Sequence, residues 1–146
     1  MPEAGAHPTP VKAAIVLAAG LPTGHAANIS ACVAAGLAAG RPGWAARPLV
    51  DAEGLSSMAS SHLPIAVLCA EPANMRALLQ ALSAAPAAEE SAVTLFPAYA
   101  QAMHDCTEYW HRHELARHSE EAMLGIGLIG PKRWVNRITG SLPLWR

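Results

Sequence analysis

The sequence has no excess of charge of either sign, and only 14% of its residues are charged. Lysine and arginine number 10 against 11 aspartates and glutamates, which leaves a formal net charge of −1. A protein that binds nucleic acids in general needs a clear basic surplus, so this class is disfavoured. Apolar residues, largely alanine, make up 52% of the 146 positions, a composition typical of a globular chain.

The sequence also lacks the signals of membrane insertion and export. No apolar run reaches the roughly 20 residues that cross a bilayer, and the first residues do not join a basic start to an apolar stretch. Cys32, Cys69 and Cys106 form no CxxC pair, so we expect free thiols in a cytoplasmic protein without membrane partners. We expect residues 1–10 to form a flexible tail and residues 11–146 a single domain.

Segments typical of strands and helices alternate along the chain. The apolar segments that we interpret as strands cover residues 12–18, 64–70, 92–96 and 122–130. Helical patterns cover residues 26–39, a segment that begins at Pro72, the second half of 98–121 and a segment that begins at Pro131. Proline and glycine in residues 41–63 favour an irregular connection, with a short strand as the alternative.

Small residues make three packing predictions. Glycines within residues 122–130 indicate that another backbone approaches this strand closely. The helix at 26–39 is small or apolar on nearly all sides, so it should lie buried against a sheet. Gly140 is placed to end the last helix in the left-handed conformation.

Helices between strands imply crossover connections, and therefore a parallel or mixed sheet. We predict an α/β fold of three layers (α/β/α), in which helices cover both faces of a four-stranded mixed sheet. The apolar C-terminal residues should pack onto this sheet through Trp134, Leu142, Leu144 and Trp145.

The two ends of the chain carry a family resemblance. The ending GPKRWVNRITGSLPLW resembles that of type 2 peptidyl-tRNA hydrolases at Gly130, Pro131, Ile138, Thr139, Gly140, Leu142 and Leu144. After the first strand, GLPTGHAANISAC resembles the loop of these hydrolases at Leu21, Gly24 and Cys32. The segments TGHAANISAC and GPKRWVNRITGSLPLW are more similar still to the domain-of-unknown-function family numbered two thousand, which is thought to share that fold. The resemblance implies a type 2 peptidyl-tRNA hydrolase-like domain.

The resemblance also shows which hydrolase residues are replaced. The two loop lysines of the hydrolases correspond to His25 and Ala27, and the loop aspartate corresponds to Gly20. The hydrolases' Asp-Ala-Gly-x-Thr-(Gln/Glu) segment has only a shorter, displaced counterpart at Asp105 to Glu108. The nearly neutral loop disfavours tRNA as a partner and peptidyl-tRNA as a substrate.

The stretch from Gly24 to Ser30 has a functional and a structural interpretation. It enters a helix whose free N–H groups can hold an anion, with Gly24, Asn28 and Ser30 as ligand-binding residues. His25 could bind a phosphate or carboxylate there, or act as a catalytic base near neutral pH. In the structural alternative, Gly24 makes a turn and His25 or Asn28 caps the helix. The GxxxxGK[ST] motif is absent, and we expect no cofactor.

Asp105 is the second candidate catalytic residue, and it rests on the resemblance alone. Its spacing to Glu108 also fits a capping box, which is the structural alternative. Lys132 and Arg133 could bind an anion at the start of the last helix, or form its solvated face.

One helix face offers candidate metal ligands. His111, Glu114 and His118 have the spacing of one face and could bind zinc or nickel. No fourth ligand is evident, so we do not predict a metal. The alternative is a charge-balanced, solvated face on which Glu114 pairs with His118 or Arg117.

Two classes of function follow. The protein could be a hydrolase that uses His25, Asn28 and Asp105 on a small ester, amide or phosphate-bearing molecule. Alternatively, it is a non-catalytic module that binds a small ligand or dimerises. In both cases we expect an unidentified small molecule and a second copy of the chain, as a homodimer, to be its partners.

Overall fold

A mixed four-stranded sheet forms the middle layer of the protein in the computed structural model, which describes residues 10–42, 47–61, 63–84 and 90–146. Its strands are β1 (Val11–Ala18), β4 (Ile65–Ala70), β5 (Ala92–Pro97) and β6 (Met123–Pro131). Their order is β4–β1–β6–β5. Strand β1 runs parallel to β4, and β6 is antiparallel to both of its neighbours. The four predicted strands are confirmed, with small differences at their ends.

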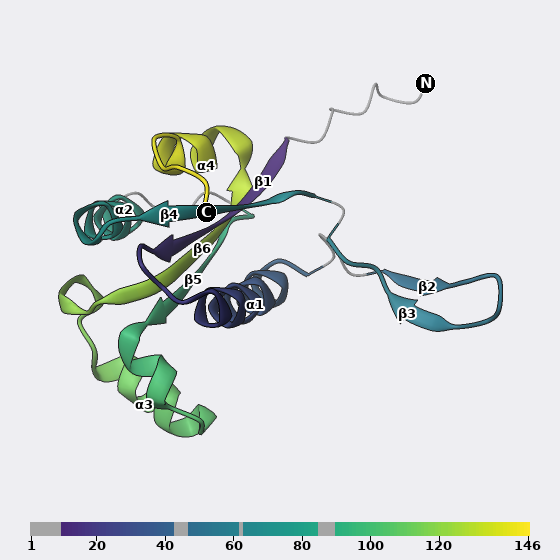
Figure 1. The fold of residues 1–146 in the computed structure, drawn as a ribbon, viewed down its shortest axis with the longest axis horizontal. Helices are drawn as coiled ribbons and strands as arrows, with labels where there is room; N and C mark the ends of the chain where they lie inside the picture. Colours follow the sequence, from purple (N-terminus) through teal and green to yellow (C-terminus); the bar gives the residue numbers. More distant parts are fainter. Residues whose placement is uncertain (1–9, 43–46, 62, 85–89) are drawn as a thin grey trace.

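Helices cover both faces of this sheet (Figure 1). One face packs against α1 (Thr23–Gly40), and the other against α2 (Pro72–Ala84) and α4 (Lys132–Thr139). The three-layer α/β fold is therefore confirmed. Beyond the end of β5 lie the short 3₁₀ helix η1 (Ala98–Ala102), helix α3 (Cys106–Leu115) and the 3₁₀ helix η2 (His118–Glu120). Of the predicted N-terminal tail, residues 1–9 lie outside the described residues.

Alternating side chains of the central strands fill a core on each face of the sheet. Ile15 and Leu17 of β1 pack with the buried side of α1. Ala14 and Val16, which point the other way, pack with α2 and α4. Each face therefore receives apolar side chains from the same strand, and the sheet is buried on both sides.

Two glycines of β6 allow α1 to lie close to the sheet. A Cβ atom on Gly125 would lie 2.8 Å from Cγ2 of Ile29, and one on Gly127 would collide with Cγ1 of Val33. A larger residue at either position would force the helix and the sheet apart. The glycines thus mark a close approach to this strand, as predicted, but the atoms that fill the space are side chains of α1 and not another backbone.

The residues that follow α4 run along the outer edge of β4. The N–H of Cys69 donates a hydrogen bond to the carbonyl of Pro143 at 2.8 Å, and the N–H of Trp145 donates one to the carbonyl of Val67 at 2.9 Å. Leu142 packs against the core under α2 and α4, whereas Trp145 packs against the core under α1. The tail thus covers a sheet edge whose backbone groups would otherwise lack these partners.

Two predictions about the C-terminal residues are wrong. Leu144 forms a β-bridge with Leu68, but its side chain is 58% exposed because successive residues of an extended segment point to opposite sides. Gly140 has φ −62° and ψ −19°, which is right-handed. A Cβ atom there would lie 2.5 Å from the carbonyl oxygen of Asn136, so the glycine provides space and not a left-handed turn.

A β-hairpin occupies much of the segment for which an irregular connection is predicted. Strand β2 (Pro48–Val50) pairs antiparallel with β3 (Ser56–Met58), and the pair projects from the body of the molecule (Figure 1). The N–H of Ala59 donates to the carbonyl of Arg47 at 2.8 Å and closes its base. We call residues 47–59 the β2–β3 arm.

Asp51 shapes the turn of this arm. Its Oδ1 accepts hydrogen bonds from the backbone N–H groups of Glu53 at 2.8 Å and Leu55 at 2.9 Å. Gly54 has a φ of +89°, a conformation that favours glycine. The arm therefore has a defined local structure although it lies away from the sheet.

Helix α1 is buried on one side only. Its inner side contributes Ala26, Ile29, Val33 and Leu37 to the core, as predicted. Its outer side is exposed although it remains almost entirely apolar. Within the described ranges, no helix combines the length and apolar character required to cross a membrane.

Candidate functional site

The start of α1 differs from the structural alternative drawn from the sequence. The helix begins at Thr23, and no side chain caps its N-terminus, so neither His25 nor Asn28 is a cap. The turn before the helix is made by Gly20, which has a φ of +81°, and not by Gly24. Gly24 therefore lies within the first turn of α1.

Asn28 and Ser30 do not converge on one anion. Residues two positions apart on a helix point to nearly opposite sides. In agreement, Asn28 is exposed and Ser30 is half-buried toward the sheet side. The arrangement leaves Gly24 and Asn28 on the outer side of α1, without the ring of donors that an anion pocket needs.

The imidazole of His25 lies beside η1. There Nδ1 accepts from Gln101, which leaves Nε2 as a hydrogen-bond donor. Its Nδ1 is 3.3 Å from Nε2 of Gln101, and the amide nitrogen can only donate. A neutral His25 in this contact carries its proton on Nε2. Nδ1 is the nitrogen that could accept a proton from a substrate, and in this contact Gln101 occupies it.

Asp105 is the N-cap of α3. Its Oδ1 accepts a hydrogen bond from the backbone N–H of Glu108 at 3.0 Å, which confirms the structural interpretation of this pair. In the part of the chain that the structure describes, no hydrogen bond joins Asp105 to His25. The two candidate catalytic residues are therefore not assembled into an acid–base pair.

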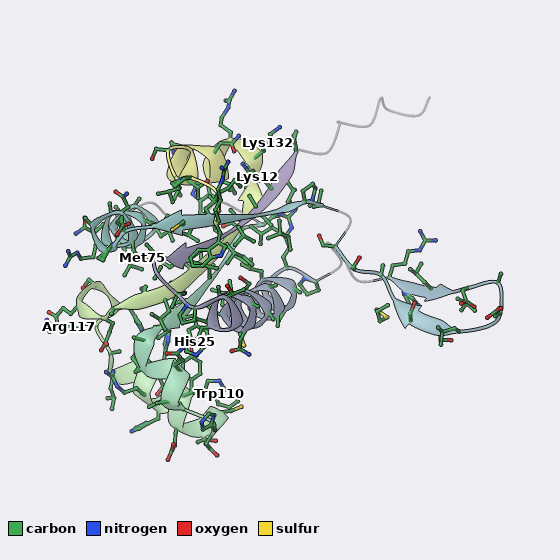
Figure 2. All side chains as sticks on the ribbon, in the orientation of Figure 1. Lys12, His25, Met75, Trp110, Arg117 and Lys132 are labelled. Atoms are coloured by element: carbon green, nitrogen blue, oxygen red, sulfur yellow. The ribbon has the colours of Figure 1, made fainter. Side chains whose placement is uncertain are left out.

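Lys132 and Arg133 lie far from the other ligand-binding candidates in the layered fold. They open α4 on one face of the sheet, whereas Gly24, Asn28 and Ser30 belong to α1 on the other face (Figure 2). Both basic side chains are exposed. The sheet thus separates the two sets, and they cannot share one ligand.

The three metal-ligand candidates do not share a helix face. Helix α3 ends at Leu115, so His118 belongs to η2 and not to the face of His111 and Glu114. Across residues 10–42, 47–61, 63–84 and 90–146, no three His, Cys, Asp or Glu side chains gather as metal ligands would.

His118 instead belongs to an aromatic and polar cluster that joins η1, α3 and η2. Its Nε2 lies 2.8 Å from the hydroxyl of Tyr99, and its ring centroid lies 4.2 Å from that of His113. The guanidinium of Arg112 lies 4.3 Å from the centre of the Tyr99 ring and forms a 2.7 Å ion pair with Glu121. These contacts fix η2 against α3.

Partial burial shifts the pKa values of two groups in this cluster, His118 and Tyr99. Burial lowers the pKa of His118, electrostatic interactions with His113 and Arg112 lower it further, and Glu121 opposes this shift only in part. Burial also raises the pKa of Tyr99. His118 is therefore neutral at neutral pH, and it forms its hydrogen bond with the protonated hydroxyl of Tyr99.

A cleft of about 440 Å³ opens where the parallel strands β1 and β4 end. Its walls come from the ends of these strands, from the start of α2, and from η2 and the first residues of β6. The lining includes Met75, Arg76, Leu79, Glu120, Ala122 and Met123. Clefts at the carboxyl ends of parallel strands are the usual place for ligands in open α/β sheets.

The lining of this cleft is apolar inside and charged at the rim. Met75, Leu79 and Met123 are buried core residues whose surfaces form its floor. Arg76 and Glu120 are exposed, and in the described ranges neither makes an ion pair or a side-chain hydrogen bond. Glu121 also lines the cleft, but Arg112 neutralises its charge.

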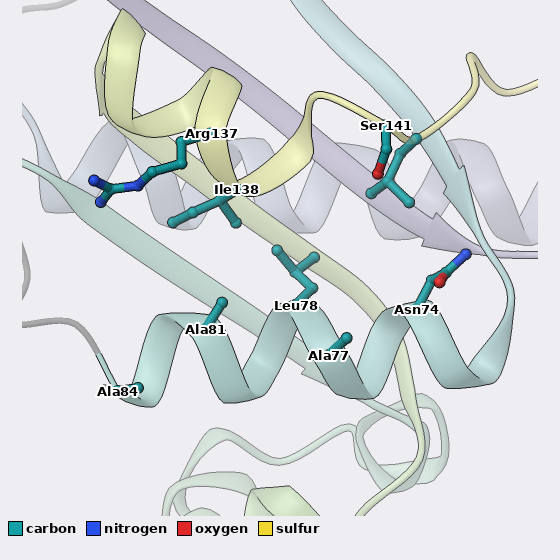
Figure 3. Close-up of a pocket in the computed structure, with 9 residues that line it drawn as sticks. Asn74, Ala77, Leu78, Ala81, Ala84, Arg137, Ile138 and Ser141 are labelled. Atoms are coloured by element: carbon teal, nitrogen blue, oxygen red, sulfur yellow. The ribbon is translucent and has the colours of Figure 1, made fainter.

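A second cavity, a groove of about 430 Å³, lies between α2 and α4 (Figure 3). Leu78 and Ile138 face one another across it, and Arg137 lies toward one end. The groove runs along two packed helices, and its lining includes no residue of β1 or β4. It is therefore a less favourable ligand site than the cleft.

The cleft was not predicted from the sequence because its lining residues come from three separate segments of the chain. One signal was available. Strands 12–18 and 64–70 each precede a helix, and strands of this kind place their carboxyl ends together. The residues just after these strands, including Ala19 and Pro72, therefore indicate where a ligand-binding cleft can lie.

Comparison with known proteins identifies the family and the fold of the chain but no ligand. The chain is similar to a solved structure titled as a protein of unknown function, Atu0240 from Agrobacterium tumefaciens str. C58, with a TM-score of 0.81 and 18% sequence identity over 93% of this chain and 98% of the other. At this identity the likeness shows the fold alone. No curated protein matches the sequence significantly. The model of the family described as protein of unknown function (DUF2000) matches residues 11–146, and the chain therefore belongs to that family.

Proposed function

We propose that this protein binds a small molecule in the cleft at the ends of β1 and β4. The observation that carries the proposal is the position of this cleft, about 440 Å³ in volume, at the carboxyl ends of two adjacent parallel strands. A volume of this size suits a ligand of metabolite dimensions.

The lining suggests the chemistry of the ligand. The side chains of Met75, Leu79 and Met123 suit an apolar body, because methionine adapts to irregular shapes. Arg76 at the rim suits a carboxylate or a phosphate, since its fork-shaped guanidinium can bind two oxygens at once. We therefore favour a small acyl-bearing or otherwise apolar molecule with one anionic group.

Hydrolysis of a small ester, amide or phosphate-bearing molecule is the second candidate. In its favour, Gln101 orients the ring of His25, and η1, to which Gln101 belongs, comes shortly before Asp105 in the chain. Against it, Asp105 is used as a helix cap, and His25 has its accepting nitrogen engaged. Binding without catalysis is the better supported of the two, and the uncharged loop before α1 disfavours tRNA in either case.

A thermal-shift screen with N-acyl amino acids, short fatty acids and nucleotides tests the binding proposal. A ligand at 100 times its Kd adds about 2.7 kcal/mol, or a rise of about 5–10 °C in Tm for a chain of this length. We expect Ala122→Trp, which fills the cleft, to abolish the shift, and Arg76→Gln to weaken it for anionic ligands.

Matched controls separate the cleft from the rest of the surface. Ala102→Trp places the same ring on exposed η1, and Arg133→Gln removes a charge from α4; neither residue lines the cleft. Both controls should keep the full shift. A shift that survives Ala122→Trp would contradict the proposed site, and turnover of an aryl ester that disappears in His25→Ala would favour the hydrolase.

A further inference from the structure

The β2–β3 arm exposes apolar side chains that nothing in the described part of the chain covers. The large apolar residues on it are Leu49, Val50, Leu55 and Met58, with exposed fractions of 44%, 68%, 68% and 60%. These four are half of the eight large apolar side chains exposed in the described residues. A two-stranded hairpin on its own is marginally stable in water, so such an arm needs support from outside itself.

The two faces of the arm both carry apolar residues but differ in charge. Residues paired across an antiparallel ladder point to the same side, and Pro48 pairs with Met58. Side chains alternate along a strand, so Val50 lies on the same face as this pair. The opposite face carries Leu49 and its partner Ser57 and, by the same alternation, Leu55 together with the charged Asp51. The face of Pro48, Val50 and Met58 is apolar and carries no charge, so it is the one best suited to be covered by an apolar partner.

A second uncovered apolar surface lies on the outer side of α1. The exposed residues from position 27 to position 39 are Ala27, Asn28, Ala31, Cys32, Ala35, Ala38 and Ala39. No Asp, Glu, Lys or Arg occurs between Thr23 and Gly40. Helices that are apolar all round are normally buried on all sides, so this outer side also lacks a partner.

We propose that the arm of one chain packs across the outer side of α1 in a second copy, in a two-fold symmetric dimer. The arm projects beyond the carboxyl end of α1 and away from its own body (Figure 1). A two-fold axis near the base of the arm therefore brings each arm over the α1 of the other copy. Such an interface is reciprocal, and it covers both apolar surfaces of both chains at once.

The extent and charge of the two surfaces fit this partner. Residues 47–58 are all exposed. Together with the exposed side of α1 they supply roughly 20 residues on each chain, which is what a standard interface of about 800 Å² per partner requires. The face of Pro48, Val50 and Met58 is uncharged, as is the outer side of α1, so no like charges meet.

Sedimentation of the full chain at neutral pH tests the proposal. We expect twice the chain mass of 15.2 kDa. Val50→Asp with Met58→Asp should make the protein monomeric or weaken the dimer by about a hundredfold or more, because charge is placed in an apolar contact. Ser57→Asp puts the same charge on the other face and should leave the dimer intact. Circular dichroism and a cooperative thermal unfolding transition check that each variant is folded.

Mixing two variants tests the pairing of arm with helix. Ala31→Arg with Ala35→Arg should also abolish the homodimer by blocking the receiving side of α1. When this variant is mixed with the arm variant, one of the two arm–helix contacts is intact, so a heterodimer should form and be visible in native mass spectra. A monomeric wild-type chain, no heterodimer, or a dimer that survives both variants through another surface such as the outer edge of β5 would each overturn the proposal.

Discussion

The C-terminal tail and the β2–β3 arm are both short extended segments rich in apolar residues, but they meet different surroundings. The tail donates and accepts backbone hydrogen bonds with β4 and buries Leu142 and Trp145 in part. The backbone hydrogen bonds found for the arm stay within it, and its apolar side chains are exposed. An extended segment therefore supports the fold only where a sheet edge and a core are both within reach.

Removing residues 141–146 should have the largest effect. The deletion loses two backbone hydrogen bonds to β4 and the partial burial of Leu142 and Trp145. We expect the free energy of unfolding to fall by about 3–5 kcal/mol, a large share of the usual total. Urea denaturation monitored by circular dichroism measures this. A loss below about 1 kcal/mol would mean that the tail rests on the fold without stabilising it.

Within the tail, neighbouring side chains should contribute unequally. Trp145→Ala removes an indole that packs against the core under α1 and should cost about 2 kcal/mol. Leu144→Ala removes a side chain that is 58% exposed, so we expect a cost of about 0.5 kcal/mol or less. Equal costs at the two positions would contradict the packing described for the tail.

Replacing residues 48–58 by a Gly-Ser linker should barely change the stability of the monomer. The arm contributes none of the buried apolar residues that form the two cores. In a chain kept monomeric by Ala31→Arg with Ala35→Arg, we expect the linker to change the free energy of unfolding by about 1 kcal/mol or less. The midpoint of thermal unfolding should lose its dependence on protein concentration if the arm forms the dimer.

The smallest expected effect is the response of the arm to pH. Hydrogen bonds from the backbone N–H groups of Leu55 and Glu53 lower the pKa of Asp51 below its usual 3.8. The contribution of its carboxylate to the turn is therefore complete above pH 3.8 and is lost as the pH falls through the lowered pKa. The amide NMR signal of Leu55 should follow this titration, and Asp51→Asn should abolish it. A midpoint above 3.8 would contradict the turn geometry.

Sequence patterns predicted the layers well because burial leaves a direct trace in them. The apolar strands and the glycines that face α1 both report packing against a continuous core. Asp105 was equally readable, since a cap is a local hydrogen bond.

The errors arise where distant parts of the chain decide the outcome. Gly140 was expected to be left-handed, but its conformation is right-handed. A glycine is needed there because a Cβ atom would collide with the carbonyl oxygen of Asn136. His118 has helical spacing to His111, yet its bond with Tyr99 accompanies a break in the helix. The hairpin of the arm was not predicted, because each of its strands has only three residues and shows no clear alternating pattern. The cleft could not be read from any motif, because its walls meet only after folding.

The position of β6 has a consequence for how this chain reaches its structure. Strand β6 is the last strand of the sheet in sequence, yet it lies between β1 and β5, and Val11 of β1 pairs with Pro131. Until β6 is in place, β1 lacks its neighbour on one side and β5 lacks its only partner in the sheet. Such non-local closure is slow, and it exposes unpaired strands to other chains. During synthesis, β1 must therefore wait for nearly the whole domain before the sheet can form, and this interval is when the protein is most open to aggregation or to a chaperone.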